Sequence, residues 1–412
     1  MNGERVVADD GAKQITERTK VLAASIKSQL DKSIPWSRAS ECSIYRVPEK
    51  LRKIDSFKYT PIRISIGPFH HAAFSLFKVQ KLRYARELLS RNTPIGTTTM
   101  LEECVECIKR IEDEVRKCYS EPINLSSDEF VELIVIDGLF IIELFRKYAH
   151  GGTIKRDDPI LGQSWGLRNS VRNLLLLENQ LPMVVLECLF NALALKKEFN
   201  GVSLNIIALQ FLNQHWMPRG ENLIVTIFSG FQGKHLLDLL GKTYFHNLPP
   251  KVGSEKKNSW KSIPSATELK CAGVKFAVGS TDGSFLDIKF KDGVMEIPPV
   301  TIKYENDTLL RNLIAYEQCC DGDVTYYMTS YGFLMDSLIN SGKDVGVLRK
   351  RGIITNLEDD DESVAFLFRK KLCSEVPVAN FYYSELCDEV NKYCKTRWYC
   401  CGVAELLCSL FS

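Results

Sequence analysis

Residues 174–182 read Leu174-Leu175-Leu176-Leu177-Glu178-Asn179-Gln180-Leu181-Pro182. The chain is helically periodic from residue 167 to residue 199, but the ring of Pro182 would clash with the carbonyl four residues earlier in an unbroken helix. We therefore predict a break near Gln180. The three polar side chains stand where Pro182 donates no backbone hydrogen bond, so we expect them to bind freed backbone groups. The alternative is that they line a ligand pocket.

Helical spacing on both sides of this break predicts a mainly α-helical protein. Ser126 and Glu129 match a capping box, and Gly151-Gly152 is typical of a helix end, so the dense apolar segment between them is expected to be a buried central helix. The acidic run 358–362 suits a helix N-terminus. Further helices are predicted at residues 12–32, 76–90, 100–119, 325–339, 364–372 and 384–393.

A short β region is predicted after residue 270. Residues 274–278, 285–290 and 294–297 alternate in apolar character, and Asp292-Gly293 is typical of a tight hairpin turn. The predicted fold class is therefore mainly α with a small antiparallel three-stranded β meander, a helix-dominated α+β protein.

The length of 412 residues exceeds the usual span of one core. Residues 249–265 are rich in proline, glycine and charge, as in a solvated connection between packed bodies. We predict an N-terminal amphipathic helix (1–34), a helical subdomain (35–248), this linker (249–265), and the β meander with further helices (266–398). A short apolar, cysteine-rich tail follows (399–412).

Composition excludes several classes of function. The net charge of +2 argues against a nucleic-acid partner. The first 20 residues contain no secretory apolar segment, and a chain of this length needs no disulfides, so its 14 cysteines are interpreted as thiols. Charged and polar residues interrupt the longest apolar runs, which predicts no transmembrane span. We expect a cytoplasmic protein that is not secreted.

No catalytic centre is recognisable. His70 and His71 are candidate metal ligands, but adjacent histidines rarely share one ion and no zinc-protease motif is present. The pair Cys104 and Cys107 lacks a second pair of ligands, and Cys104 falls on the apolar stripe of a helix, where cysteine acts as a small hydrophobe. Gly241-Lys242-Thr243 lacks the upstream glycine of a phosphate-binding loop. We predict no metal and no cofactor.

Several motifs together resemble a plant family. Residues 176–182 resemble the central motif of the family known as domain of unknown function 247, and motifs at 44–48, 65–71, 137–145, 265–276 and 311–318 agree in order. The resemblance extends from about residue 42 to residue 398. The positions that it marks as candidate sites are Gly67, Pro68, His70, His71, Glu178, Asn179, Gln180, Pro182, Asn312 and Glu317.

The resemblance implies a role without an established enzymatic activity. Some members of the family are associated with pollen-side recognition in grass self-incompatibility and with suppression of female organ development. We therefore expect a non-enzymatic regulatory or recognition protein that acts through a protein partner in plant reproductive development. The alternative is a small-molecule-binding protein or an uncharacterised enzyme that uses Glu178-Asn179-Gln180 and the His70-His71 loop as a pocket.

The C-terminal tail departs from the family pattern, in which a membrane helix commonly follows a tryptophan-containing stretch. Only 14 residues follow Trp398, and Glu405 interrupts them, so they are too short to span a bilayer. Their apolar residues repeat at helical spacing, which predicts either peripheral membrane contact or docking against the core. Candidate acylation sites are Cys400, Cys401 and Cys408.

Overall fold

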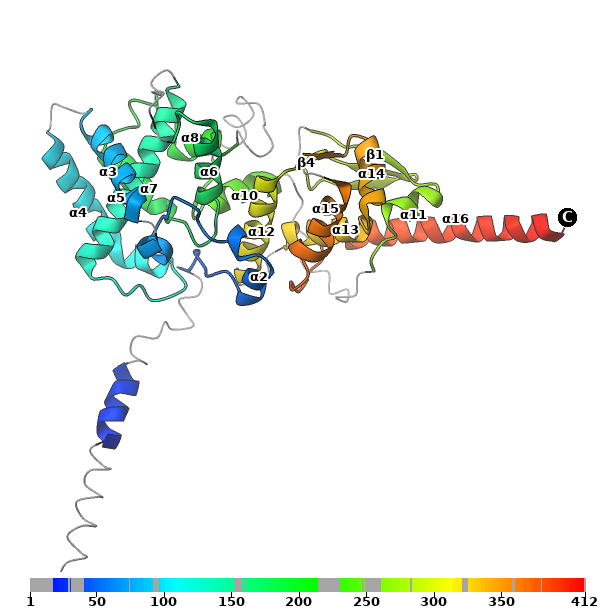
Figure 1. The fold of residues 1–412 in the computed structure, drawn as a ribbon, viewed down its shortest axis with the longest axis horizontal. Helices are drawn as coiled ribbons and strands as arrows, with labels where there is room; N and C mark the ends of the chain where they lie inside the picture. Colours follow the sequence, from blue (N-terminus) through cyan, green and yellow to red (C-terminus); the bar gives the residue numbers. More distant parts are fainter. Residues whose placement is uncertain are drawn as a thin grey trace, which may run out of the picture.

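The fold is helix-dominated, which confirms the predicted class at this level. Figure 1 shows a larger and a smaller part that lie side by side, with helix α12 (Tyr304–Cys319) between them. The computed structural model describes residues 18–28, 30, 41–73, 75–91, 96–151, 158, 160–213, 230–246, 248, 261–281, 284–320, 325–357, 360–378 and 380–410.

Helix α5 (Ser127–Ala149) is the centre of the larger part. Ser126 accepts a hydrogen bond from the Glu129 amide and forms the predicted capping box. Nearly every side chain from Phe130 to Lys147 is buried, because α5 packs against α3, α4, α7 and α8. The other elements of this part are α2 (Glu49–Ile54), η2 (Ser56–Lys58), η3 (Pro68–Ala73), α3 (Ser75–Leu89), α4 (Thr97–Lys117), α6 (Ser164–Leu174), α7 (Met183–Ala192), α8 (Leu204–Asn213) and α10 (Leu236–Phe245).

The predicted helix break is confirmed. Helix α6 ends at Leu174 and α7 begins at Met183, directly after Pro182. Residues 175–182 form a buried, non-helical connection between the two helices.

The smaller part combines short helices with two small sheets. The acidic run was predicted to suit a helix N-terminus, and Asp360 caps α15 by accepting from the Ser363 amide; residues 358 and 359 of the run lie outside the described ones. The elements are α11 (Ala266–Cys271), β1 (Lys275–Val278), β2 (Lys289–Lys291), β3 (Val294–Ile297), β4 (Val300–Ile302), α13 (Tyr327–Leu338), α14 (Gly342–Lys350), β5 (Ile354–Asn356), α15 (Asp361–Phe366), the π-helical turn η4 (Leu367–Leu372) and α16 (Ser384–Leu410).

The predicted antiparallel meander is wrong in its strand order. The sheet runs β1-β3-β2, with β1 parallel to β3 and only β2 antiparallel to it. Residues 285–288 form a turn that Ser284 stabilises and that buries Phe285, Leu286 and Ile288. The chain therefore becomes extended only at Lys289, and β2 lies at the edge of the sheet beside β3. The Asp292-Gly293 hairpin is confirmed, with positive φ at both residues (50° and 77°). A second sheet, parallel β4-β5, was not predicted.

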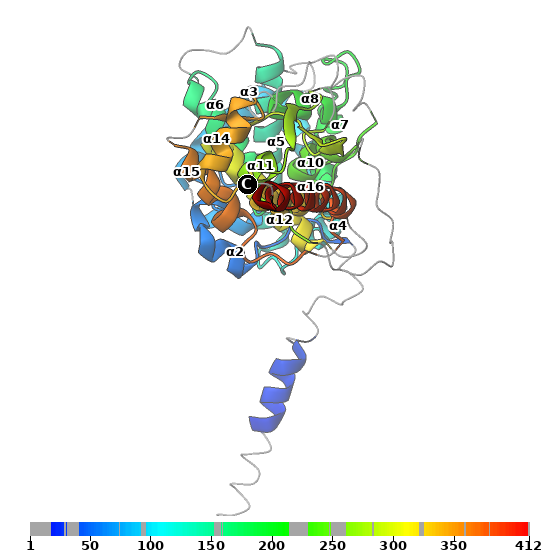
Figure 2. The same ribbon diagram turned by 90° about the vertical axis from the view of Figure 1, so that its right-hand side faces the viewer.

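Near each end of the chain a helix extends from the body, formed by residues 18–28 and by α16 (Figures 1 and 2). Residues 18–28 are helical, within the predicted 12–32, and the rest of that prediction lies outside the described residues apart from residue 30. The predicted linker lies outside them from residue 249 to residue 260. At the other end, residues 399–410 continue α16. The side chains of Cys400, Cys401 and Cys408 lie outside the described ones.

Candidate functional site: a buried polar network around residues 178–180

The helix break carries Glu178, Asn179 and Gln180 into the core, where each is 1% exposed. A charged or polar side chain at this depth destabilises the fold unless it is paired. The bonding partners of the three residues therefore decide between the two predicted roles, binding of the backbone and lining of a pocket.

The carboxylate of Glu178 is surrounded by donors. Its Oε1 accepts from the Val47 amide at 2.7 Å and contacts the Arg52 guanidinium. Its Oε2 lies 3.2 Å from Nη1 of Arg46 and 3.1 Å from Nε2 of His70. Burial raises the pKa of Glu178, but the hydrogen bonds from His70 and Val47 and the charge of Arg52 outweigh it and lower the pKa to about 2. Glu178 is therefore an ionised carboxylate held by the 46–52 and 68–73 segments.

Asn179 binds only backbone groups. Its Oδ1 accepts from the Ile66 amide at 2.7 Å, and its Nδ2 donates to the carbonyls of Ile64 and Asn173, each at 2.9 Å. The side chain thereby attaches the extended segment before Gly67 to the end of α6. Both of its donors and one acceptor position are used inside the protein, and the residue is only 1% exposed, so it is not placed to contact a ligand.

Gln180 likewise serves the freed ends of two helices. Its Nε2 donates to the carbonyls of Leu174 (2.7 Å) and Leu176 (2.8 Å), which have no helical partner after the break. Its Oε1 accepts from the Leu237 amide in the first turn of α10. The contacts of Asn179 and Gln180 favour the backbone-binding role.

The 65–71 loop meets this network at Gly67 and His70. Gly67 has a φ of +69°, and a Cβ there would lie 2.7 Å from the Gln180 carbonyl oxygen. Both the backbone conformation and this close contact therefore require glycine. Its amide donates to Asp137 Oδ2 at 2.8 Å. Pro68 begins the turn η3, and its carbonyl lies 2.8 Å from Nδ1 of His71. His70 therefore contacts Glu178, whereas His71 contacts a carbonyl of its own loop.

The marked residues of α12 extend the network across the molecule. Asn312 accepts from the Leu177 amide at 2.9 Å and donates to the Lys58 carbonyl at 2.9 Å, so it attaches α12 to the helix break. Glu317 accepts from the amides of Met328 (2.7 Å) and Thr329 (2.8 Å) and from the Thr329 hydroxyl. Burial raises the pKa of Glu317 to about 7 although these donors lower it. Thus α12 binds the helix break through Asn312 and the N-terminus of α13 through Glu317.

Several partners in this network were not predicted from the sequence. Arg46 and Arg52 are more than 120 positions from Glu178 in the chain. Lys81 pairs with the fully buried Asp137 and donates to the Ser65 carbonyl. One signal was available, since Asp137 interrupts the apolar stretch from Leu133 to Ile142, where an unpaired carboxylate is strongly disfavoured.

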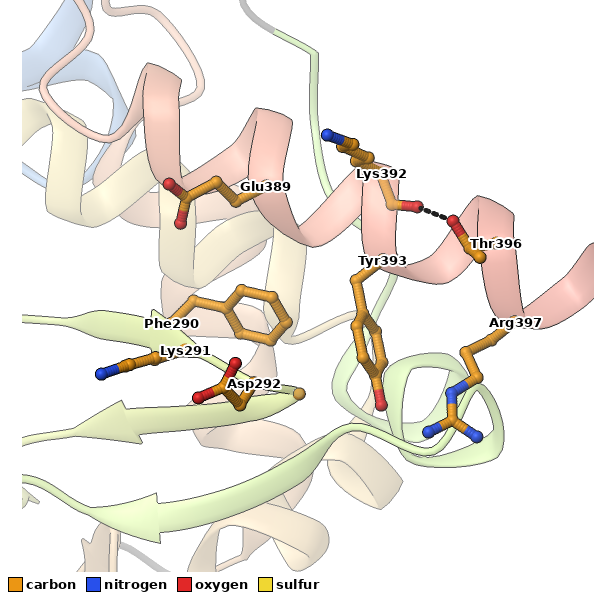
Figure 3. Close-up of a pocket in the computed structure, with 9 residues that line it drawn as sticks. Phe290, Lys291, Asp292, Glu389, Lys392, Tyr393, Thr396 and Arg397 are labelled. Atoms are coloured by element: carbon orange, nitrogen blue, oxygen red, sulfur yellow. Dashed lines mark hydrogen bonds between the residues drawn. The ribbon is translucent and has the colours of Figure 1, made fainter.

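Two surface cavities lie elsewhere. One of about 510 Å³ forms where the β2–β3 hairpin meets α16 (Figure 3). There Tyr393 packs edge-on against Phe290 with ring centroids 5.6 Å apart, and its hydroxyl lies over Gly293. This cavity carries mixed charge, from Asp292 and Glu389 as well as Lys291, Lys392 and Arg397. The second, of about 700 Å³, lies between α11, β1 and α14. Neither is lined by the His70-His71 loop or by residues 178–180.

No group of three or more histidine, cysteine or acidic residues in the described ranges has an arrangement that would hold a metal ion. Among the same residues, no helix has the length and apolar character needed to cross a membrane.

These features define a helix-dominated protein in which polar motif residues join segments that are distant in the chain. The chain belongs to the family DUF247, described as plant protein of unknown function, whose profile matches residues 44–412 and confirms the resemblance. It is similar to the UPF0481 protein At3g47200 of Arabidopsis thaliana, with 29% identity over 384 residues, 87% of this chain and 78% of that protein. It is also similar to the putative UPF0481 protein At3g02645 of Arabidopsis thaliana, with 22% identity over 449 residues, covering 86% and 83%. No solved structure matches.

Proposed function

We propose that this protein acts without catalysis, by binding a protein partner through its surface. The observation that carries the proposal is the bonding of Glu178, Asn179 and Gln180. These are the polar residues of the central motif, and their hydrogen bonds go to backbone groups and cations of the same chain. Residues used in this way hold a fold together, which leaves recognition to exposed side chains.

The pocket alternative loses its main support in this geometry. It requires that the 178–180 break and the His70-His71 loop share a cavity. His70 reaches Glu178, but as a partner of a carboxylate that two arginines also hold, and His71 binds the Pro68 carbonyl. A substrate there would have to displace contacts that keep Glu178 ionised in the core.

The N-terminal helix offers a surface for testing a partner. Leu22, Ile26 and Leu30 recur every four residues, so they share one helical face, and they are 62%, 48% and 65% exposed. Arg18, Lys20 and Lys27 add positive charge to the same helix. An amphipathic helix with these properties suits an acidic protein groove that takes up its apolar face.

The test compares two double variants of the tagged full-length protein in plant cells after chemical crosslinking. Leu22→Ser/Ile26→Ser changes the N-terminal face, whereas Val79→Ser/Leu82→Ser removes equally exposed apolar side chains from α3. The proposal predicts that a partner protein crosslinks to the wild type and to the α3 variant but not to the N-terminal variant. The identified partner is then expected to form a complex of fixed stoichiometry with the purified wild-type protein. Equal recovery by all three proteins would contradict it.

We place this activity in plant reproductive development, in self-incompatibility recognition or suppression of female organ development. The support is the family resemblance. Plants that lack the protein are then expected to show altered pollen acceptance or altered pistil development. Normal seed set and normal floral organs in such plants would remove this assignment without affecting the binding proposal.

We also propose that the protein is cytoplasmic and that residues 399–412 attach it peripherally to membranes. The support is the apolar helical spacing of this segment and the presence of Cys400, Cys401 and Cys408. Fractionation of full-length protein and of a version ending at Trp398, with and without hydroxylamine, tests the idea. It predicts membrane binding that truncation abolishes and that hydroxylamine weakens. Equal solubility of both forms would overturn it.

A further inference from the structure

The cavity between α11, β1 and α14 is lined by positive charge alone. Its charged lining consists of Lys270, Lys275, Lys343, Arg349, Lys350 and Arg351, with no acidic residue among the lining side chains. Its remaining lining is Gly273, Val274, Phe276, Gly346 and Val347. We call this cavity the basic groove. The protein as a whole carries a net charge of only +2, so the groove is a strong local concentration of charge.

The cations of the basic groove are largely uncompensated. Arg349 pairs with Asp361, at 3.0 Å between Nη2 and Oδ2. Among the residues that the structure describes, no carboxylate lies within ion-pair distance of the other five cations. Like charges that share a concave surface repel one another and focus a positive potential, which attracts anions.

Helix electrostatics explains only part of the cluster. Lys270 lies in the last turn of α11, and Arg349 and Lys350 lie in the last turn of α14, where the helix dipole favours cations. Lys343 lies in the first turn of α14, where the dipole disfavours a cation, and Lys275 stands on the strand β1. Helix electrostatics therefore does not account for the positions of these two lysines.

The size and chemistry of the basic groove suit clustered phosphates. Its volume of about 700 Å³ is within the range of sites for small ligands. Lysine ammonium groups and arginine guanidinium groups are the common protein partners of phosphate. Val274 and Phe276 also line the groove but are only 3% and 6% exposed, so its accessible surface is mainly that of the cations.

The position of the basic groove is compatible with a membrane. Figures 1 and 2 show α11 and α14 at the end of the molecule from which α16 projects. A headgroup bound there would lie at the same end as residues 399–410 of α16.

We propose that the basic groove binds a ligand with clustered phosphate groups, of the inositol polyphosphate class, either free or as the headgroup of a phosphoinositide. This site is independent of the proposed protein partner, because it uses none of the N-terminal helix.

The experiment uses purified full-length protein at physiological salt. Binding of inositol hexakisphosphate is measured by calorimetry. Binding to vesicles is measured by co-sedimentation with phosphatidylcholine alone, with added phosphatidylinositol bisphosphate, and with phosphatidylserine at matched charge. Lys275→Gln/Lys343→Gln removes two cations of the groove. Lys196→Gln/Lys197→Gln removes two exposed cations of the larger part and serves as the control.

The proposal predicts binding of the soluble ligand or of phosphoinositide vesicles, weakened at least about tenfold by the groove variant and unchanged in the control. Vesicle binding beyond that of matched phosphatidylserine identifies the lipid source, and binding of the free ligand alone identifies the soluble source. Absence of binding to both probes, or equal weakening in both variants, would overturn the proposal. All four lysines are exposed, so both variants are expected to fold.

Discussion

Glu178 and Glu317 are both buried carboxylates at positions that the family motifs mark, yet the protein compensates them differently. Glu178 meets Arg46, Arg52 and His70 as well as a backbone amide. Glu317 receives hydrogen bonds from two amides and a hydroxyl, all of them neutral. The pKa of Glu178 is lowered to about 2, and that of Glu317 is raised to about 7. Burial alone therefore does not set the charge of a carboxyl group, because the charge of its partners decides.

The largest effect is expected on the Glu178 side of this comparison. Glu178→Gln keeps the shape but points an amide NH₂ at cations, so Arg46 and Arg52 lose their common partner. Loss of one member of a buried ion pair typically costs about 3–5 kcal/mol. Urea unfolding followed by circular dichroism measures the change.

Glu121→Gln is a matched control for that variant. Glu121 lies 3.0 Å from Nε of the same Arg46, but it is 53% exposed. A surface ion pair contributes about 1 kcal/mol or less. Equal unfolding midpoints for Glu121→Gln and Glu178→Gln would show that the buried carboxylate of Glu178 contributes no more to stability than the exposed carboxylate of Glu121.

A second substitution tests whether Asn179 serves the backbone. Asn179→Asp places an oxygen where Nδ2 donates to the carbonyls of Ile64 and Asn173, beside the ionised Glu178. We expect a loss of about 2–4 kcal/mol in unfolding free energy at neutral pH. Wild-type stability of this variant would contradict the backbone-binding role.

The approach of Gly67 to the helix break is tested by Gly67→Ala. The methyl group would meet the Gln180 carbonyl at a positive φ, so we expect a loss of about 2–3 kcal/mol. Gly201→Ala is the control, since Gly201 also has a positive φ (+83°) but has open space around the added Cβ. The control is expected to lose about 1 kcal/mol. Identical losses would mean that the close packing at Gly67 contributes nothing.

The smallest effect, and the most specific, is the pH dependence of Glu317. Its pKa is raised on folding, so the folded state binds its proton more tightly and stability falls as pH rises from about 4.5 to 7. Glu178 has the opposite sign, because its lowered pKa stabilises the fold above about 4.5 and that contribution is lost on acidification towards 2. Between about pH 5 and pH 7, Glu317 should account for about 2 kcal/mol of declining stability.

Glu317→Gln removes this titration. The variant is less stable at all pH values, since the Thr329 amide and hydroxyl lose an acceptor, but its decline from pH 5 to pH 7 should be shallower than that of the wild type. Unfolding midpoints in urea across this range provide the test. Parallel curves for the two proteins would show that Glu317 does not titrate there.

Features fixed by local chemistry were predictable from the sequence. The capping box at Ser126 and Glu129, the break before Pro182 and the turn at Asp292-Gly293 each depend on residues within a few positions of one another. The strand order was not predictable in this way. The parallel pairing of β1 with β3 depends on how Phe285 and Leu286 pack into the core, which no alternation of residues reveals.

In the candidate site, too, local features were predictable from the sequence and long-range contacts were not. The polar residues of the break were visible in the sequence, because they interrupt an apolar run. Their partners were not, because Arg46 and Arg52 become neighbours of Glu178 only after the chain has folded. The basic groove also escaped notice, since its cations come from α11, β1 and α14 and form no run in the sequence.

The opposite shifts in the pKa of Glu178 and Glu317 are tested most directly by a carbon-13 NMR titration of glutamate side chains from pH 4 to pH 8. The variants Glu178→Gln and Glu317→Gln assign the two carboxyl signals. We predict that the Glu178 carboxyl signal stays at its ionised position throughout and that the Glu317 signal shifts with a midpoint near 7. Titration of Glu178 within this range, or a Glu317 signal that stays at its ionised position throughout, would contradict the account.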